Sequence, residues 1–329
     1  MATVTLRRTG GAARGDPAVR HRDPSRARWW VVLAFMSPFL IGLALFVIYP
    51  VCATLYYSFT NFQAGSYLPV KWVGFRNYTT LFTASDTFWV AVRNTLWMVI
   101  IMVPLQTLWA MFVAWVALRV RRGRGFYRSL YFLPATVPVV AAALSFIVML
   151  NPVGPVNHVL ALFGIPGPGW FGDAAWSKPS LVLMALWACG EVMIIFSAAM
   201  LDVPRELYEA GDIDGVNTWQ RFRHITLPAI SPVIFFSLLT GMIYTFQYFT
   251  EAFVASGSAN VEASTDERIG YPQQSLLFYT TDLYQQGFIY FKTGYASAMA
   301  WLLFLVILAC TLVFIRFARR WVYYAGGVR

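Results

Sequence analysis

Six stretches of the chain are long, apolar and almost free of charged residues. A helix that crosses the hydrocarbon core of a bilayer needs about 20 such residues, which each stretch supplies. The apolar residues run continuously and do not alternate with a period of two, so the strands of a membrane β-barrel are not expected. The sequence therefore predicts an all-α, polytopic membrane protein with six transmembrane helices, over about residues 29–56, 94–118, 129–150, 179–201, 228–254 and 293–315.

The composition favours a membrane protein over a soluble or nucleic-acid-binding one. Hydrophobic residues make up 58% of the 329 residues and charged residues 12%, whereas soluble chains carry about 25% charged residues. The formal net charge of +10 alone would suit a nucleic-acid partner. The basic residues are, however, gathered between the apolar stretches, a pattern that sets the orientation of membrane proteins. We therefore expect contact with membrane lipid and no nucleic-acid partner.

The distribution of Lys and Arg predicts which ends of the chain face the cytoplasm. Residues 1–28, the second and fourth connections and the C-terminal end together carry 19 of the 25 basic residues. Cytoplasmic segments of membrane proteins carry this excess, so both termini are expected in the cytoplasm. Residues 1–28 form a polar, basic tail that we expect to be disordered, and residues 321–329 form a cytoplasmic C-terminal tail.

The cytoplasmic connection over residues 202–228 is unusual because it is rich in acidic residues. Pro204 suits the first turn of a helix, and acidic residues there face the positive end of the helix dipole. Gly215 can end that helix, and Asn217 or Thr218 can cap a second one. We predict two short helices joined by a glycine turn. An acidic helix is a poor match for an anionic membrane surface, so docking to a protein is favoured over lying on lipid.

The same connection contains a motif with a defined spacing. Glu209-Ala210-Gly211 is followed after three residues by Gly215, and after nine more by Ile225, Leu227 and Pro228. This pattern resembles the cytoplasmic motif of the permease subunits of binding-protein-dependent ABC importers. The flanking segments PRELYEAGDIDG and WQRFRHITLPAISP resemble the carbohydrate-uptake branch of that family. The chain departs from the family at Gly211, where alanine is usual, and in a polar insert within the outer connection 255–292.

The resemblance implies a fold, a function and a set of partners. It implies the type I ABC importer permease fold and a subunit that passes a sugar or related polar solute from an extracytoplasmic binding protein into the cytoplasm. Two cytoplasmic ATPase subunits would bind ATP and Mg²⁺, and this chain would bind no cofactor. A second permease chain, expected to be a different one, would complete the pore in the inner membrane of a prokaryote.

The resemblance also assigns a role to the acidic connection, which would be the contact with the ATPase. The residues expected there are Glu206, Leu207, Glu209, Ala210, Gly211, Asp214 and Gly215. Among them, the face that packs closely on the ATPase would be formed by Leu207, Ala210, Gly211 and Gly215.

Polar and aromatic residues inside the apolar stretches are candidates for a sugar site, because a sugar offers hydroxyl groups and an apolar ring face. Glu191 lies at the middle of the fourth stretch, where a carboxylate is costly unless it faces water or a partner. Trp187 lies one turn earlier on the same face and could stack on the sugar ring. In the fifth stretch, a stripe recurs at helical spacing: Tyr244, Gln247, Tyr248 and Glu251. Contacts between helices would explain these residues as well, and are preferred for the isolated Asn94, Gln106 and Ser145.

Other classes of function fit the sequence less well. A proton-coupled secondary transporter could use Glu191 as its proton carrier, but it needs no acidic docking segment. A membrane enzyme has no support, because the three histidines and three cysteines form no catalytic or metal-binding pattern. No lysine follows a glycine as in a nucleotide-binding loop. The substrate stays open among a disaccharide, an amino sugar, and a glycerol phosphate or phosphodiester.

Overall fold

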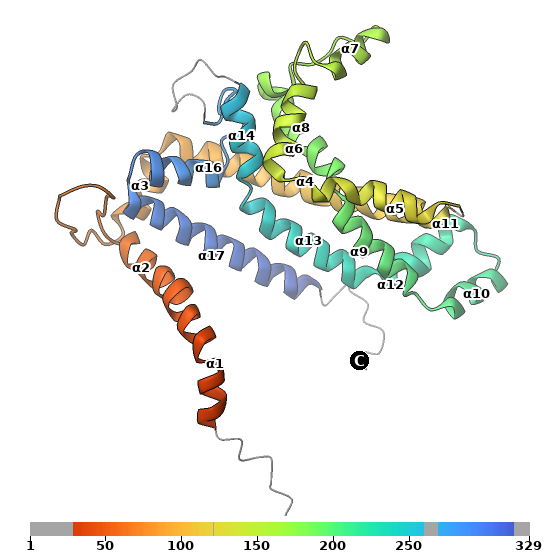
Figure 1. The fold of residues 1–329 in the computed structure, drawn as a ribbon, viewed down its shortest axis with the longest axis horizontal. Coiled ribbons are helices and arrows are strands. Elements are labelled where there is room, and N and C mark those ends of the chain that lie inside the picture. The colour runs from red at the N-terminus through yellow and green to blue at the C-terminus, as the bar shows by residue number, and fades with distance from the viewer. Residues whose placement is uncertain (1–28, 121, 260–268, 319–329) are drawn as a thin grey trace, which may run out of the picture. The chain divides into compact units, whose positions relative to one another are not determined.

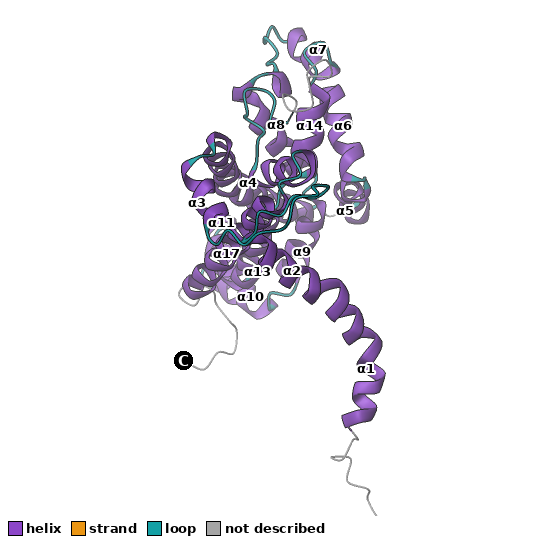
Figure 2. Cartoon of the chain, turned by 90° about the vertical axis from the view of Figure 1, so that its left-hand side faces the viewer, coloured by secondary structure: helices purple, strands orange, loops and turns teal. Residues whose placement is uncertain are grey.

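The computed structural model describes residues 29–120, 122–259 and 269–318. Within these ranges the chain consists of helices and loops, with one isolated antiparallel bridge between Thr60 and Trp72 and no strand (Figure 2). The prediction of an all-α protein is therefore confirmed. The basic tail predicted at residues 1–28 and the C-terminal tail at residues 321–329 lie outside the described residues.

The chain divides into two compact units, residues 1–52 and 53–329. The described part of the first unit contains α1 (Trp29–Leu43), the π-helical η2 (Ala44–Ile48) and the beginning of α2 (Tyr49–Ser58). Neither α1 nor η2 has a buried residue. A helix that is apolar on every face is typical of the core of a large protein or of a membrane span.

The second unit is an assembly of helices around the long helix α4 (Figure 1). Its elements after α2 are, in chain order, α3 (Arg76–Thr83), α4 (Asp86–Arg119), α5 (Arg124–Phe132), η3 (Leu133–Thr136), α6 (Val139–Met149), α7 (Pro155–Leu162), η4 (Trp170–Gly172), α8 (Ala174–Trp187), α9 (Gly190–Leu201), α10 (Arg205–Ile213), α11 (Thr218–Arg221), η5 (Phe222–Thr226), α12 (Leu227–Ala229), α13 (Ser231–Phe246), α14 (Thr250–Ala259), α16 (Tyr279–Tyr284), η6 (Gln285–Ile289) and α17 (Thr293–Ala318).

Helix α4 spans 34 residues, about 50 Å at a rise of 1.5 Å per residue. The Ser85 side chain caps its start by accepting a hydrogen bond from the Phe88 N–H. Asp86 and Arg119 lie in its first and last turns, where their charges complement the helix dipole. The helix packs against α9 and α13, and small buried residues on it permit this close approach: Ala110, Ala114 and Ala117.

Three helical runs are long and apolar enough to cross a membrane singly: Trp29–Ser58, Asp86–Arg119 and Thr293–Ala318. Three more spans are obtained if each of three bent helix pairs counts as one, which gives the predicted total of six. The bends measure 98° between Gly125–Thr136 and Val139–Met149, 48° between Ala174–Trp187 and Gly190–Leu201, and 67° between Thr218–Ala229 and Ser231–Phe246. The third, fourth and fifth stretches are therefore formed by broken helices and not by continuous ones.

Local sequence explains these bends. Pro138 precedes α6, and Val137 before it is extended, as a residue before proline prefers. Pro232 lies in the first turn of α13, where proline is tolerated because no helical partner is needed for its missing N–H. At the start of α9, a Cβ atom on Gly190 would collide with the carbonyl oxygen of Tyr131 in α5. Only glycine lets α9 begin this close to the backbone of α5.

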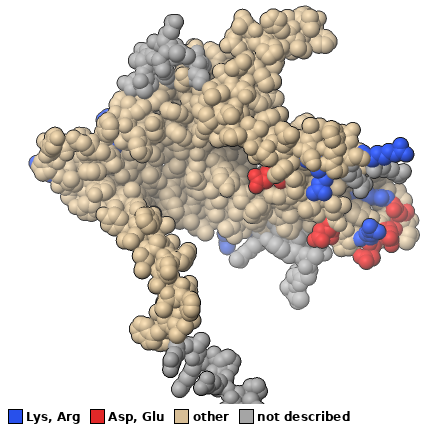
Figure 3. Space-filling model, in the orientation of Figure 1, with Lys and Arg blue, Asp and Glu red and all other residues tan. Residues whose placement is uncertain are grey.

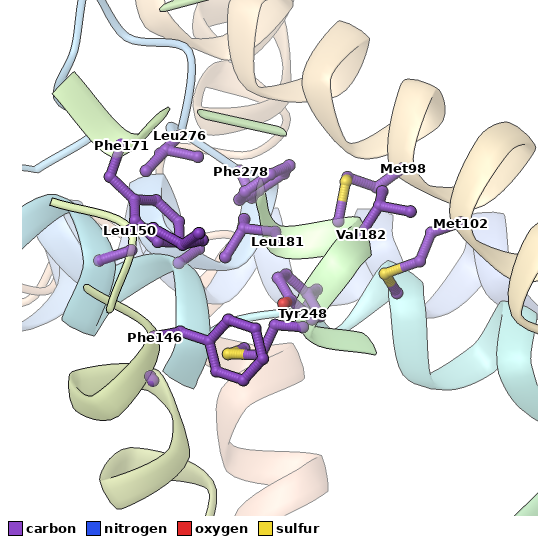
Figure 4. Packing of buried hydrophobic residues seen from close by; sticks show 14 residues of the cluster. Met98, Met102, Phe146, Leu150, Phe171, Leu181, Val182, Tyr248, Leu276 and Phe278 are labelled. Atoms are coloured by element: carbon purple, nitrogen blue, oxygen red, sulfur yellow. The ribbon is translucent and has the colours of Figure 1, made fainter. Parts of the chain in front are cut away.

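A cluster of buried apolar side chains joins α4, α6 and α8 to the chain around residues 248 and 278 (Figure 4). Met98, Leu181 and Phe278 are each at most 1% exposed. The ring of Tyr248 meets the ring of Phe278 edge-on, with 5.7 Å between their centroids. This cluster fixes the segment that follows α13, which also contributes to the pocket described below.

Buried Asn94 anchors the loop that precedes α16. Its Nδ2 donates to the carbonyl oxygens of Gln274 and Leu277 at 2.8 and 2.9 Å. Its Oδ1 accepts a hydrogen bond from Lys178 Nζ at 2.9 Å. Asn94 therefore bonds to a loop as well as to α8, whereas the sequence predicted a bond between helices only.

The two other isolated polar residues differ from each other. Gln106 makes the predicted bond between helices, from its Nε2 to the carbonyl oxygen of Ala185 in α8 at 3.2 Å. Ser145 donates to the carbonyl oxygen of Ala141 within its own helix, as serine often does inside apolar helices. The prediction for Ser145 is therefore wrong.

We expect Gly190→Ala to destabilise the second unit, because the added Cβ would meet backbone atoms and overpacking costs about 1–3 kcal/mol. Gly125→Ala is the matched control, since nothing lies within 4 Å of a Cβ built there. The measurement is the temperature at which half of the detergent-solubilised protein leaves the monodisperse size-exclusion peak. Equal temperatures for the two variants would contradict the close packing of α9 on α5.

Candidate functional site

A pocket of about 600 Å³ lies between α4, α9, α13 and the first turn of α14. This volume is within the range of about 300–1,000 Å³ that is usual for ligand pockets. Residues from five helices, including Ala185 of α8, and from the break between α13 and α14 form its walls. Five of the six predicted substrate residues line it: Glu191, Tyr244, Gln247, Tyr248 and Glu251.

Both carboxylates of the pocket lie where a helix begins. Glu191 is in the first turn of α9, just after the break in the fourth stretch, and Glu251 is in the first turn of α14. The N–H groups of a first turn have no partner within the helix and carry partial positive charge, which stabilises a carboxylate. The breaks thus explain how two carboxylates are accommodated inside apolar stretches.

Side chains from other elements bond the backbone groups that the breaks release. Gln106 Nε2 donates to the carbonyl oxygen of Ala185 in the last turn of α8. Thr280 Oγ1 donates to the carbonyl oxygen of Tyr248, which follows the end of α13. These bonds hold the two breaks in place and so fix the walls of the pocket.

Tyr248 presents an unpaired hydroxyl group. The residue is 9% exposed, and its hydroxyl has no hydrogen-bond partner among the described residues. A buried hydroxyl left without a partner costs about 1–3 kcal/mol.

The predicted position of Trp187 is wrong. Trp187 is the last residue of α8 and does not line the pocket. Its ring packs edge-on against Phe146, with 5.4 Å between the centroids. The expectation of a common face with Glu191 assumed a continuous helix, whereas α8 ends at Trp187 and α9 begins at Gly190 with a different axis.

The pocket also contains polar residues that were not predicted as substrate residues: Gln106, Thr107, Ser237, Thr240, Thr245 and Thr250. A signal for two of them was present in the sequence. Ser237 and Thr240 continue the stripe of Tyr244 and Gln247 backwards at spacings of three and four residues, which place them on one helix face. Gln106 and Thr107 carried no such signal, because nothing in the sequence shows which helix packs beside α13.

Residues 202–228 form the two predicted short helices, α10 and α11. Gly215 lies between them with φ of 71°, a left-handed conformation that favours glycine. Asn217 caps α11, since its Oδ1 accepts hydrogen bonds from the N–H groups of Trp219 and Gln220 at 3.0 and 2.9 Å. The prediction of two helices joined by a glycine turn is confirmed.

Contacts within this segment hold α10 against α11 and η5. The hydroxyl groups of Tyr208 and Thr226 are 3.0 Å apart and share a hydrogen bond. Arg221 forms an ion pair with Asp212, and its guanidinium lies 6.0 Å from the centroid of the Tyr208 ring. The segment is therefore a defined structure and not an extended linker.

The outward face of α10 combines apolar and acidic side chains. Leu207 and Ile213 are 48% and 88% exposed, and Ala210 between them is exposed as well. Acidic residues of this segment are exposed around them: Glu206, Glu209, Asp212 and Asp214. In the space-filling view, acidic and basic side chains gather at the end of the molecule that carries α10 and α11 (Figure 3).

Gly211 does not share that outward face. It is buried, and a Cβ atom built on it points at Ile225 and Val216 of the same chain. The expectation that Gly211 packs with Leu207 and Ala210 on a partner is therefore wrong. Its small size instead lets α10 pack against the segment that leads into α12.

No group of three or more His, Cys, Asp and Glu side chains able to hold a metal ion occurs among the described residues. The three cysteines are free.

Comparisons with known proteins agree with this architecture. Residues 106–322 match the family described as "Binding-protein-dependent transport system inner membrane component". The chain is 33% identical over 293 residues to the probable ABC transporter permease protein YesP of Bacillus subtilis (strain 168), covering 88% of this chain and 91% of YesP. It is 30% identical to the lactose transport system permease protein LacF of Rhizobium radiobacter, covering 86% and 91%.

The fold is similar to that of a chain in the crystal structure of a bacterial ABC transporter involved in the import of the acidic polysaccharide alginate. The TM-score is 0.73 at 23% sequence identity, over 89% of this chain and 96% of that chain. The predicted ABC importer permease fold is confirmed by this likeness. The chain therefore belongs to the family of binding-protein-dependent transport system inner membrane components, as a multi-pass permease subunit of an ABC importer and not as an enzyme.

Proposed function

We propose that the chain carries a sugar through the pocket between α4, α9, α13 and α14. The lining of this pocket is the observation that carries the proposal, because hydroxyl, amide and carboxylate groups alternate there with aromatic rings. Sugar hydroxyls both donate and accept hydrogen bonds, and the apolar face of a sugar ring packs on aromatic side chains. The relative LacF, which is named for lactose transport, supports a sugar as the substrate class.

The charges of the pocket narrow the range of candidate substrates further. Among the described residues that line it are two carboxylates, Glu191 and Glu251, and no lysine, arginine or histidine. Two carboxylates with no basic side chain beside them repel a further anion, so a glycerol phosphate or phosphodiester is a poor match. Neutral sugars and amino sugars remain, and both can donate hydrogen bonds to the two carboxylates. A proton-coupled secondary transporter finds no support in the family to which the chain belongs.

The outward face of α10 supports a cytoplasmic ATPase subunit as a partner. Its apolar stripe of Leu207, Ala210 and Ile213, bordered by acidic residues, suits an apolar cleft with a basic rim on a cytoplasmic ATPase subunit. Two such subunits would bind ATP and Mg²⁺ and drive the cycle. A second permease chain would close the pore on the side that this chain leaves open, and an extracytoplasmic binding protein would deliver the sugar at the opposite face.

Docking of α10 on the ATPase requires that this end of the molecule lies in the cytoplasm. The excess of basic residues in the same connections supports that orientation, with both termini in the cytoplasm.

The substrate class can be tested with the complex reconstituted in lipid vesicles together with its ATPase subunits and binding protein. We expect ATP hydrolysis to be stimulated by the binding protein with neutral or amino sugars. Glycerol phosphate and amino acids should give no stimulation. Stimulation by glycerol phosphate alone would overturn the assignment of the pocket to a sugar.

Replacing Glu191 should weaken uptake of that sugar. In Glu191→Gln, a neutral acceptor replaces a charged one, and charge-assisted hydrogen bonds are stronger by about 1 kcal/mol, or about fivefold in apparent affinity. A larger loss is expected for an amino sugar, whose positive charge loses its partner. The measurement is the concentration dependence of radiolabelled uptake at equal permease abundance. Asp173→Asn is the control, because Asp173 caps α8 outside the pocket and asparagine caps equally well. An equal change of apparent affinity in both variants would show that Glu191 does not lie on the substrate path.

We expect the backbone conformation of Gly215 to be essential for coupling ATP hydrolysis to sugar transport. Nothing lies within 4 Å of a Cβ built there, but its φ is 71°, a conformation that costs most residues about 1–2 kcal/mol. Gly215→Leu should therefore misplace α10 and reduce the amount of sugar transported per ATP hydrolysed. Gly215→Asn should retain most of the wild-type ratio of transport to hydrolysis, because asparagine tolerates this conformation. The ratio of uptake to ATP hydrolysis in vesicles is the measurement. Normal coupling in Gly215→Leu would argue against docking through this segment.

The orientation can be tested by thiol labelling of a cysteine-free background. We expect Leu162→Cys, on the exposed end of α7, to react with an impermeant thiol reagent added outside right-side-out vesicles. Arg122→Cys, in the exposed loop before α5, should react only after the vesicles are opened. The opposite pattern would reverse the proposed orientation.

A further inference from the structure

Another polar pocket, of about 370 Å³, lies at the C-terminal end of α4, where α9, α10 and α11 meet it. Nothing in the substrate path uses it. It is lined by Trp115, Leu118 and Arg119 of α4, Met200 of α9, Tyr208 of α10, Thr218 and Arg221 of α11, and Phe222 and Thr226 of η5.

The charge of this pocket is opposite to that of the substrate pocket. Two arginines and no acidic residue occur among the described residues that line it. Arg119 is held in place by an aromatic ring, since its guanidinium lies 3.9 Å from the centroid of the Trp115 ring. Hydroxyl groups of Tyr208, Thr218 and Thr226 add neutral donors. This combination suits an anion with several oxygen atoms, and above all a phosphate group.

Arg221 is only partly satisfied by the protein. It forms an ion pair with Asp212, which lies outside the pocket lining. Its Nε is buried and has no hydrogen-bond partner among the described residues. A small rotation of the guanidinium toward a phosphate oxygen would give this N–H the acceptor that the protein does not supply.

The position of the pocket favours a phosphate that belongs to a lipid. Arg119 ends a helix that is long and apolar enough to cross a membrane, and Trp115 lies one turn before it. Arginine and tryptophan at the end of such a helix mark the level of the lipid head groups. Phe112 continues the same helix face toward the apolar part of α4 and is 50% exposed, so it offers a surface to an acyl chain.

We infer that this pocket binds the phosphate of an anionic phospholipid of the inner leaflet, between Arg119 of α4 and Arg221 of α11. The bound lipid would join the cytoplasmic end of α4 to α11, and thereby to the segment 202–228 that we propose docks on the ATPase. The inference goes beyond the proposed function and depends on it only for the orientation that puts α10 in the cytoplasm.

The test measures lipid binding to the full-length chain in detergent micelles by native mass spectrometry, without sugar or ATPase. Phosphatidylglycerol and phosphatidylcholine with identical acyl chains are compared, and inorganic phosphate is tested as a competitor. We expect Arg119→Gln and Arg221→Gln each to weaken the tightest phosphatidylglycerol site about fivefold, as expected for the loss of one basic contact. Phosphatidylcholine should bind more weakly, and neither substitution should change its binding.

Two further variants separate a defined site from general surface charge. Arg122→Gln removes an exposed arginine close to Arg119 in sequence but outside the pocket lining, and should leave binding unchanged. Asp212→Asn breaks the ion pair of Arg221 without removing a cation, and should keep or strengthen binding. Equal weakening by Arg122→Gln and Arg119→Gln would overturn the site. Displacement of the lipid by inorganic phosphate at millimolar concentration would assign the pocket to a soluble anion and overturn the lipid as its ligand.

Discussion

The hydrogen-bonding requirement of the backbone governs how this chain can be built inside a membrane. Hydrocarbon supplies no partner for a free N–H or C=O group, so a helix can be interrupted at membrane depth only where protein or a polar cavity satisfies the released groups. Two interruptions adjoin the substrate pocket, one between α8 and α9 and one between α13 and α14. Gln106 and Thr280 bond backbone carbonyls at these two places. The pocket and the broken helices are therefore parts of one arrangement.

This arrangement also explains the chemistry of the pocket. A new helix that begins at membrane depth brings unpaired N–H groups and partial positive charge with it. Carboxylates can be placed in that first turn at a lower cost than in the middle of a continuous helix, and Glu191 and Glu251 are both found there. In the proposed function, these carboxylates would select the solute, because they can accept hydrogen bonds from sugar hydroxyls and would repel phosphate.

Much of the architecture was predictable from residues that act over short distances. The apolar stretches indicated the spans, and Pro204, Gly215 and Asn217 indicated the two helices α10 and α11. The bends were not predictable from hydropathy, because an apolar run looks the same whether its helix is straight or broken. That is why Trp187 was placed on the face of Glu191. The orientation of Gly211 was missed for a related reason: only tertiary contact shows that Ile225 covers it.

Helix α9 connects the two functional regions of the second unit. Its first turn carries Glu191 in the substrate pocket, and Asp202 at its end leads through Pro204 into α10. The whole helix has 12 residues, about 18 Å at 1.5 Å per residue. Buried Met193 and Phe196 pack it on α4 and on Ile230 before α13. A displacement of α10 by the proposed ATPase partner would therefore reach the carboxylate through a single packed helix. Helices α4 and α13, which also line the pocket and pack on α9, would have to adjust to it.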